Sequence, residues 1–441
     1  MRNRGVSSSL AAIGAVVALL IGIGAGLAIG PVVFPAQAAT VTTTLVSTQI
    51  MTQTVTQTAG LTGKIIIGAL LPLTGDLASY GENSRVTLEI AVRDVNDYLR
   101  RVGAPVTVEL AIEDTQTKPD VALTKLQSLA ARGVKIFIGP QTSAEVRQIK
   151  SYADSNKLLL VSQSSTAPAL AIPDDYVFRF CPDDTIQGPA ISSVAKALGV
   201  KAVVQVWRGD AWGDGLQEST KKSGEAFGFE YAEGVRYAPE AKEFSAEVRL
   251  LNDRVTQLLQ KYKPEEIAVE LIAFNEAVTF IVQAAEYPNL AKVRWLGSDG
   301  TAQLDELIKE PTAAQFAATV NWINPIFAPT ESDKYTRLVD EAKARLGRVP
   351  DSYAIAAYDQ LWVLALAILQ VGKYDAEAVK DVLPNVANNF FGASGWIVLN
   401  AAGDRATADY SLWAVRETAQ GYEWVKVGVY NAASGSVTLT G

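Results

Sequence analysis

Histidine is absent from this 441-residue chain, and cysteine and methionine are scarce, with one and two residues. The missing imidazole excludes Ser-His-Asp and Cys-His nucleophiles and the usual histidine ligands of zinc. The lone Cys181 excludes an internal disulfide framework, so stability must come from packing. No pair of acidic residues stands out from a solvated surface. These absences argue against an enzyme, and we expect neither a metal nor a cofactor.

Positive charge is also sparse. The chain has 39 basic and 47 acidic residues, a formal net charge of −8, and its basic residues form no cluster. Proteins that bind nucleic acids carry basic patches or stripes that neutralise phosphates. Nucleic acid is therefore not an expected partner.

No charged residue occurs between Arg4 and Lys64. Within this gap, Leu10–Phe34 is almost wholly apolar and long enough to cross roughly 30 Å of hydrocarbon as a helix. The two arginines before it favour the inner side of the membrane, so the rest of the chain is exported. A cleavable signal is the alternative, because Ala36-Gln37-Ala38 has the form of a cleavage site. Residues 1–39 are thus predicted to be a signal peptide or an N-terminal membrane anchor.

Residues 40–62 form a Thr-rich linker with almost no side chain large enough to build a core. Without apolar bulk the segment cannot offset the entropy of ordering, so we expect an extended spacer. Its composition is also that of O-glycosylated stalks.

The remaining residues, 64–441, are too many for one ordinary core and predict two lobes. Short apolar runs alternate with amphipathic stretches, which is typical of α/β folds with parallel sheets. The predicted strands are 65–71, 106–112, 134–138, 158–161, 202–206, 231–235, 267–272 and 293–296, and the clearest helices are 119–132, 143–155, 215–227 and 244–262. Two consecutive βα series predict two doubly wound lobes.

Ligands of open parallel sheets bind beyond the carboxyl ends of the strands. Two loops at such ends carry hydroxyl groups just before helices: Thr142 and Ser143 in one, and Ser164, Ser165 and Thr166 in the other. Free N–H groups and the helix dipole attract carboxylates at such positions. The alternative is that these residues are only helix caps. Because the two loops belong to neighbouring βα units, a carboxylate site is plausible.

Three further residues lie on such loops. Asp299, in Leu-Gly-Ser-Asp-Gly, is a candidate partner for a ligand ammonium, or else a turn aspartate with local backbone bonds. Tyr80 and Trp212 are large aromatics on Gly-flanked loops. Aromatic side chains on such loops either line a ligand pocket or pack against their own lobe.

Six motifs recur in the order found in one known family. They are Ile67-Gly-Ala-Leu-Leu-Pro-Leu-Thr-Gly with Tyr80-Gly81, Glu113-Asp-Thr-Gln-Thr-Lys-Pro, Ile138-Gly-Pro, Ser165-Thr-Ala-Pro, Trp212-Gly-Asp-Gly and Leu296-Gly-Ser-Asp-Gly. With these motifs the chain resembles the branched-chain amino-acid type of periplasmic solute-binding proteins, which serve ATP-driven (ABC) importers. The resemblance covers essentially the whole chain after Lys64.

The resemblance implies a type I periplasmic binding fold, with two lobes joined by three crossings that close on a ligand by hinge motion. The crossings would lie near 181–184, 321–325 and 396–400. The first lobe would then comprise 64–182 and 325–397, and the second lobe 183–324 and 398–441.

The resemblance also implies roles for the candidate residues. The ligand carboxylate would meet Thr142, Ser143 and the 164–166 loop, the ammonium would meet Thr166 and Asp299, and Tyr80, Trp212 and Phe274 would surround the rest. Tyr353 aligns loosely with a further cleft residue. Two departures from the family put an aliphatic branched side chain in doubt: the acid is often Glu where Asp299 stands, and Tyr is frequent where Trp212 stands.

Three functions follow from these observations. The first is an extracytoplasmic receptor, at the cell surface, that delivers an amino acid to the permease subunits of an ABC importer. Amides, urea and aromatic acids are alternative ligands. The second is a ligand-sensing ectodomain, which would need a signalling partner protein. The third, an exported enzyme, lacks a visible nucleophile or metal cluster.

Overall fold

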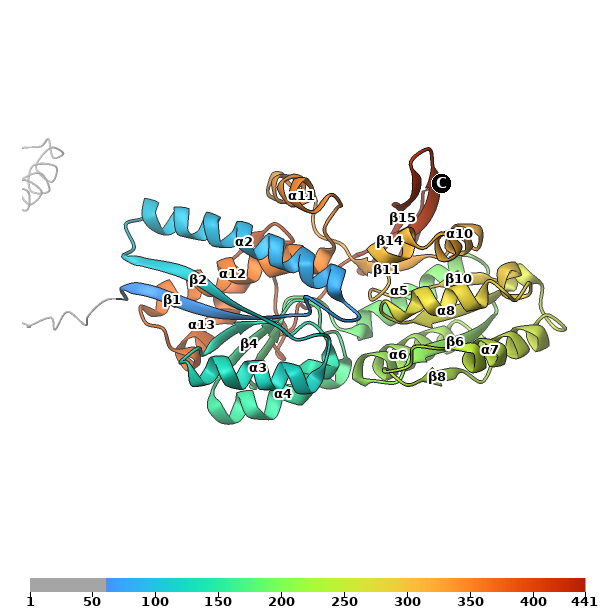
Figure 1. The fold of residues 1–441 in the computed structure, drawn as a ribbon, viewed down its shortest axis with the longest axis horizontal. Coiled ribbons are helices and arrows are strands. Elements are labelled where there is room, and N and C mark those ends of the chain that lie inside the picture. Colours follow the sequence, from blue (N-terminus) through green and yellow to red (C-terminus); the bar gives the residue numbers. More distant parts are fainter. Residues whose placement is uncertain (1–60, 441) are drawn as a thin grey trace, which may run out of the picture. The chain divides into compact units, whose positions relative to one another are not determined.

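The computed structural model describes residues 61–440, so the predicted leader and all but the end of the linker lie outside the described residues. The first sheet is parallel, with strand order β2-β1-β3-β4-β5 (Figure 1). Its strands are β1 (Gly63–Leu71), β2 (Val106–Asp114), β3 (Ile136–Ile138), β4 (Leu159–Ser162) and β5 (Val177–Arg179). From Ile67 onward β1 is buried on both faces, which accounts for its unbroken apolar run.

The second sheet is also parallel, with order β10-β9-β6-β7 and β8 paired with β6. Its strands are β6 (Ala202–Arg208), β7 (Glu230–Tyr231), β8 (Val235–Tyr237), β9 (Ile267–Ile272) and β10 (Arg294–Leu296). The two sheets confirm the predicted α/β class with parallel sheets. Each sheet with its covering helices is called a lobe below, the first containing β1 and the second containing β6.

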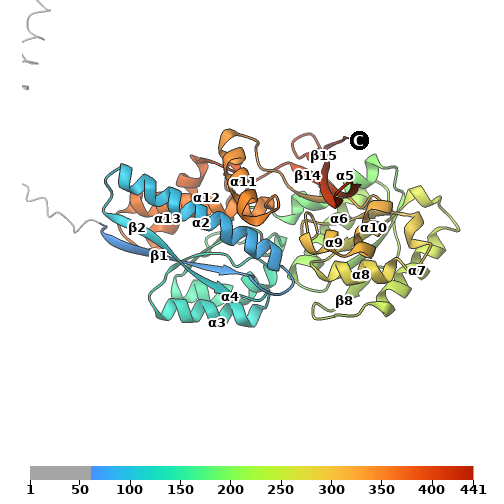
Figure 2. The same cartoon turned by 45° about the horizontal axis from the view of Figure 1, so that its top comes forward.

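The helices of the first lobe cover both faces of its sheet. They are α2 (Ala78–Arg101), α3 (Pro119–Ala131), α4 (Ser143–Asn156), α12 (Ser352–Val371) and α13 (Ala376–Asn388), with α11 (Asp333–Leu346) packed against α2. Helices α2 and α12 lie together on one side of the strands, and α3 and α4 lie together on the other (Figure 2). Leu88, Val95 and Leu99 recur at helical spacing, which places them on one face of α2, and all three are buried.

Among residues 61–440, only α12 is long and apolar enough to span a membrane. Its most apolar window is 72% buried inside the protein, as expected for the core helix of a lobe.

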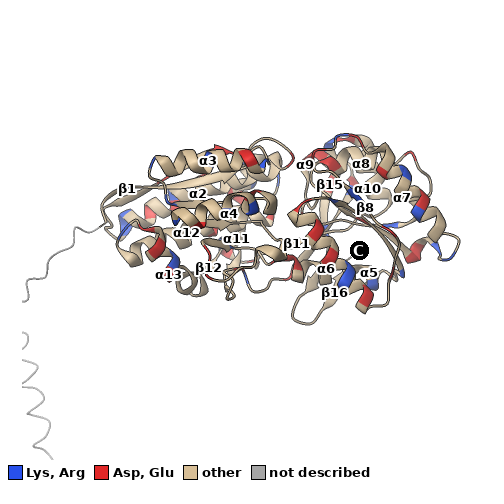
Figure 3. Cartoon of the chain, turned by 90° about the horizontal axis from the view of Figure 1, so that it is seen from below, with Lys and Arg blue, Asp and Glu red and all other residues tan. Residues whose placement is uncertain are grey.

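The second lobe is covered by α5 (Asp184–Ala197), α6 (Ala211–Ala226), α7 (Ser245–Leu258), α8 (Glu276–Ala284), α9 (Asp305–Lys309) and α10 (Pro311–Thr319). Helix α5 packs against α6, and α8 packs against both α7 and α10. Short 3₁₀ turns occur at Pro168–Leu170, Pro264–Glu266 and Leu290–Lys292. Acidic and basic residues are interspersed along the helices of both lobes, without a basic stripe (Figure 3).

An antiparallel sheet that the sequence reading did not identify completes the second lobe. Its order is β11-β14-β15-β16, with β11 (Asn324–Phe327), β14 (Tyr410–Thr418), β15 (Gly421–Asn431) and β16 (Ser436–Leu439). Strand β11 lies beside β10, through a bridge between Leu296 and Ile323. A separate short hairpin joins β12 (Phe391–Gly392) to β13 (Gly395–Trp396).

Three predicted elements differ from the structure. The helix expected over 244–262 is α7, which ends four residues earlier, at Leu258. The strand expected over 231–235 is divided into β7 and β8, and Gly234 lies between them against Gln205 and Trp207. The helix expected from Gly215 begins four residues earlier, because the Asp210 carboxylate caps it by accepting from two N–H groups at 3.0 Å. Trp212 therefore lies in the first turn of α6 rather than on a loop.

The chain passes between the lobes after β5, after β11 and before β14. Arg179, the last residue of β5, forms a parallel bridge with Asp404, and Leu399 pairs with Arg405. Arg179 and Asp404 also form a buried ion pair with two contacts of 2.6 Å. The segment from 399 to 405 thus lies against the first sheet, while the lobe boundaries at 182, 324 and 397 stay a prediction.

Candidate functional site

The lobes meet at the carboxyl ends of their parallel strands, and a small buried cavity lies between them. It is lined by Leu77, Tyr80, Gln141, Thr142, Ser143, Ser164, Trp212, Phe274, Asp299, Gly300 and Tyr353. Seven of the nine residues predicted from the sequence are in this lining. Ser165 and Thr166 are not. Of the other four lining residues, Tyr353 was aligned loosely with a cleft residue, whereas Leu77, Gln141 and Gly300 were not predicted as site residues.

Tyr80 links the lobes directly. It lies in the first turn of α2 rather than on the predicted loop, and its ring is 2% exposed. Its hydroxyl is within hydrogen-bonding distance of the carbonyl oxygens of Asp299, at 3.0 Å, and of Ala302. Tyr80 therefore contacts the second lobe across the cavity instead of packing only on its own lobe.

Thr142 caps helix α4. Its hydroxyl accepts from the N–H of Glu145 at 3.2 Å and donates to the Glu145 carboxylate at 2.8 Å, and that carboxylate also accepts from the Thr142 N–H at 2.9 Å. This capping box engages the hydroxyl hydrogen of Thr142, so that hydrogen is not free to reach a ligand. The next first-turn N–H groups, of Ser143 and Ala144, have no acceptor within the helix and favour an anion.

Ser143 joins the two hydroxyl-bearing loops. Its oxygen accepts from the Ser165 hydroxyl at 3.0 Å and from the N–H groups of Thr166 at 3.2 Å and Ala167 at 3.1 Å. Among the described residues nothing accepts its own hydrogen, so Ser143 is the hydroxyl donor best placed for a carboxylate in the cavity.

The other hydroxyls of the second loop are engaged with the protein. Ser164 lines the cavity but donates to the carbonyl of Gln141 at 2.8 Å. Ser165 donates to the Ser143 oxygen and does not line the cavity. Thr166 donates to the Asp184 carboxylate at 3.1 Å, so in this structure it faces a second buried acid rather than the cavity.

Asp299 is the acidic group of the cavity and is 3% exposed. One carboxylate oxygen accepts from the Tyr353 hydroxyl at 2.5 Å, whereas Oδ1 has no hydrogen-bond partner within the described chain. Burial raises the pKa of Asp299 to about 6, against the opposing effect of the Tyr353 hydrogen bond. An unpartnered buried carboxylate oxygen is costly, and a cation beside it would offset that cost.

A second buried acid reinforces this preference. Asp184 accepts from Thr166 and, at 2.8 Å, from Gln187, whose amide oxygen in turn accepts from the Asp299 N–H at 3.0 Å. Burial, and then the nearby charge of Asp299, raise the pKa of Asp184 well above its ordinary value. A cation bound at this point would lower the pKa of both carboxyl groups.

Trp212 and Phe274 form an aromatic wall of the cavity. Their rings stack with centroids 4.6 Å apart and planes 12° from parallel. Gly300 permits this arrangement, because a Cβ at its position would lie 2.7 Å from the Trp212 ring and 2.9 Å from the Phe274 ring. The wall is therefore flat and bulky, and it narrows the site.

The cavity measures only about 20 Å³. That is room for about one water molecule, whereas pockets for small molecules usually measure about 300–1,000 Å³. Tyr80 and Tyr353 bond across the cavity, so the lobes are closed in this structure. A ligand can enter only if the lobes separate.

Comparisons with known proteins agree with this geometry. Residues 64–420 match the model of a family described as periplasmic binding protein. An uncharacterized protein of Methanocaldococcus jannaschii is 35% identical over 391 residues, covering 85% of this chain and 91% of that protein. The leucine-, isoleucine-, valine-, threonine- and alanine-binding protein of Pseudomonas aeruginosa is 24% identical over 362 residues, 80% of this chain and 88% of its own.

A solved structure has the same fold. The solute-binding protein of an ABC transporter from Rhodopseudomonas palustris, in complex with 3,4-dihydroxybenzoic acid, superposes with a TM-score of 0.67 at 18% identity. The match covers 84% of this chain and 98% of that protein.

Proposed function

Because the chain belongs to the periplasmic binding protein family, we propose that it is the extracytoplasmic receptor of an ABC importer and binds an amino acid between its lobes. It is a binding protein and not an enzyme. The observation that carries the amino-acid assignment is the unpartnered Oδ1 of Asp299, a buried acid of the cavity wall beside the second buried acid, Asp184. This pair favours an ammonium group.

The first-lobe lining of the cavity suits the ligand carboxylate. The Ser143 hydroxyl and the N-terminal N–H groups of α4 are donors there, and the helix dipole adds attraction for negative charge. Carboxylate donors on the first lobe and an ammonium acceptor on the second would let one zwitterion hold both lobes closed.

The aromatic wall limits the side chain of the ligand. Because the stacked rings of Trp212 and Phe274 narrow the site, we propose an aliphatic amino acid that is small among the branched-chain ligands and their relatives. The Pseudomonas aeruginosa relative, whose name includes alanine and threonine as well as leucine, isoleucine and valine, supports this class.

An aromatic acid is the second candidate ligand, because the Rhodopseudomonas palustris protein holds one and the Trp212 ring offers a flat surface. Such a ligand has no ammonium for Asp299. We therefore rank it below an amino acid, and we rank amides and urea, which lack the carboxylate, lower still. A sensing ectodomain would use the same site.

The proposed importer partner requires the receptor to stay near the membrane. Residues 1–39, as an anchor or a cleaved signal, and the linker over 40–62 are proposed for this role from the sequence, since both lie almost wholly outside the described residues.

A thermal-shift screen tests the proposal. The full chain is heated with each amino acid, urea, short amides and aromatic carboxylates, because a ligand of the folded state alone raises the melting temperature. Stabilisation by one or a few aliphatic zwitterions supports the receptor function. If only simple acids stabilise the chain, the proposed ligand is an aromatic acid and not an amino acid.

Amino-acid binding should weaken in acid. Asp299 must be ionised to hold an ammonium, and burial raises its pKa to about 6. Below that pH the affinity should fall by about tenfold per unit as the free carboxyl takes up its proton, and above pH 7 it should be nearly constant. Titration calorimetry from pH 4.5 to 8 measures this, and Asp299→Asn should show a weaker dependence, because only the second buried acid, Asp184, is then left to titrate. A flat profile in the native chain would contradict the role.

Replacing Trp212 with alanine should relax the preference for small side chains. Removing the indole opens space beside Phe274, and each methylene accommodated is worth about 1–3 kcal/mol. We expect the ratio of the leucine to the alanine dissociation constant to fall by about tenfold or more. Trp396→Ala, which removes an indole that is 57% exposed, is the matched control and should leave the ratio unchanged. An unchanged ratio in Trp212→Ala would mean that the aromatic wall does not determine which size of ligand side chain is preferred.

A further inference from the structure

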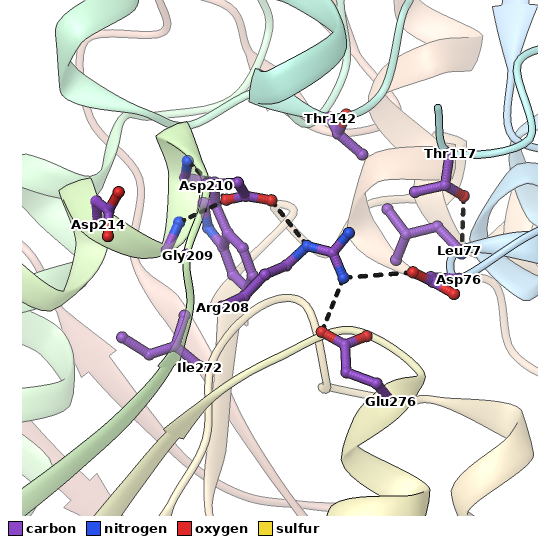
Figure 4. Close-up of polar contacts among 12 residues, drawn as sticks. Asp76, Leu77, Thr117, Thr142, Arg208, Gly209, Asp210, Asp214, Ile272 and Glu276 are labelled. Atoms are coloured by element: carbon purple, nitrogen blue, oxygen red, sulfur yellow. Dashed lines mark hydrogen bonds and ion pairs between the residues drawn. The ribbon is translucent and has the colours of Figure 1, made fainter. Parts of the chain in front are cut away.

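A second and larger cavity, of about 600 Å³, lies beside the candidate site and shares Thr142 and Phe274 with it. Charged residues from both lobes line it: Asp76, Lys118 and Asp120 from the first lobe, and Arg208, Asp210, Glu240 and Lys242 from the second. Figure 4 shows the centre of this group, where the Arg208 guanidinium lies among the carboxylates of Asp76, Asp210 and Glu276.

Asp76 makes its polar contacts across the cleft. Its Oδ2 lies 3.3 Å from Nη1 of Arg208, its Oδ1 lies 3.1 Å from Nζ of Lys242, and its carbonyl accepts from the N–H of Asn275 at 3.3 Å. Asp76 belongs to the loop between β1 and α2, whereas all three partners belong to the second lobe. These contacts exist only while the lobes are closed.

Arg208 is held by its own lobe and does not depend on Asp76. Its Nε donates to Asp210 at 2.8 Å and its Nη1 donates to Glu276 at 2.9 Å, and the residue is 6% exposed. The guanidinium therefore keeps its place and its neutralising partners when the lobes separate. It offers Nη1 as a fixed hydrogen-bond donor to the approaching Asp76, and Lys242 supplies positive charge that the two carboxylate partners of Arg208 do not cancel.

The same guanidinium supports the wall of the candidate site. It lies over the Phe274 ring, 4.7 Å from the centroid, and Phe274 stacks on Trp212. The Asp76 contact thus forms next to the aromatic wall that would face the ligand.

We propose that Asp76 is an electrostatic latch between the lobes, which closes on Arg208 and Lys242 and adds to the stability of the closed form. Its biological role rests on the proposed receptor function, in which closure retains the ligand. The latch itself acts without ligand, because both of its sides belong to the protein. It also makes closure sensitive to salt, since Lys242 is well exposed and Asp76 partly so.

Energy transfer between dyes on the two lobes of the ligand-free full chain tests the latch. Dyes are attached through Ser128→Cys on α3 and Gln257→Cys on α7, both exposed sites, while the buried Cys181 stays unlabelled. The ratio of open to closed molecules is measured in this labelled chain, in Asp76→Asn and in Asp120→Asn. Asp120 lines the same cavity and loses the same charge, but its exposed side chain makes no ion pair within the described residues.

Asp76→Asn should raise the open-to-closed ratio about tenfold, and Asp120→Asn should leave it nearly unchanged. Raising NaCl from about 0.02 M to about 0.5 M should open the chain that retains Asp76 and have little further effect on Asp76→Asn. The latch is wrong if Asp76→Asn keeps the same ratio and the same salt response as the Asp120→Asn control. No ligand is present in this experiment, so a negative result contradicts the latch but does not bear on the receptor proposal. Likewise, a ligand screen without any stabilising compound would not bear on the latch.

Discussion

Replacing Asp299 with asparagine should weaken binding of the amino-acid ligand by about 2–5 kcal/mol, the range for losing one partner of a buried charge pair. That is at least about 30-fold in the dissociation constant. The cause is local: Asp299 is buried, its Oδ1 has no partner within the described chain, and the ligand ammonium would be its counter-charge. Asparagine keeps the shape and can still accept from Tyr353, so the fold should persist.

Titration calorimetry with the stabilising amino acid measures this loss. Asp253→Asn removes an equal charge from an exposed position on α7 and should bind like the native chain. If Asp299→Asn keeps full affinity, Asp299 does not hold the ammonium and the site needs a different cation partner.

Replacing Asp404 with asparagine should lower the free energy of unfolding by about 3–5 kcal/mol, the cost of leaving one member of a buried ion pair alone. Arg179 and Asp404 have side chains that are 0% and 1% exposed. Arg179 also donates to the carbonyls of Ser165, at 3.1 Å, and Ala167, at 2.8 Å. Loss of the pair should therefore loosen the loop behind Ser143 as well as the link between β5 and the later segment.

Urea unfolding of the full chain gives the size of the effect. The control is Glu377→Gln, which breaks the Lys157–Glu377 pair, with a 2.8 Å contact and side chains that are 60% and 55% exposed. Exposed pairs contribute about 0–1 kcal/mol, so the control should be almost as stable as the native chain. Equal stability of the two variants would mean that the buried pair does not hold these segments together.

The predicted α/β class with parallel sheets, which the structure confirms, rests on local pattern. Unbroken apolar runs such as Ile67–Leu71 indicate strands buried on both faces, and polar loops after them indicate where a ligand could bind. Chain order along a parallel sheet then brings those loops to one edge. Within the first sheet this brings Tyr80 and Ser143 to one edge, and Asp299 reaches the same cavity because the corresponding edge of the second sheet faces the first lobe.

Several contacts that the sequence did not predict depend on partners far away in sequence. No pattern around Thr166 shows that its hydroxyl binds Asp184, whereas Thr142-Ser-Ala-Glu145 has the spacing of a capping box and was a usable signal. The antiparallel strands near the C-terminus were missed, although the alternating valines of β15 were a usable signal. The Asp76 latch was invisible for the same reason, since Arg208 is 132 residues away.

The most direct test of the account is titration of the full chain with three related compounds: the amino acid that stabilises it, the amine formed by removing its carboxylate, and the acid formed by removing its ammonium. Only the zwitterion should bind tightly, because Ser143 and the N-terminus of α4 hold the ligand carboxylate while Asp299 holds the ligand ammonium. Tight binding of the deaminated acid would contradict it, since Asp299 would then have no part in recognition.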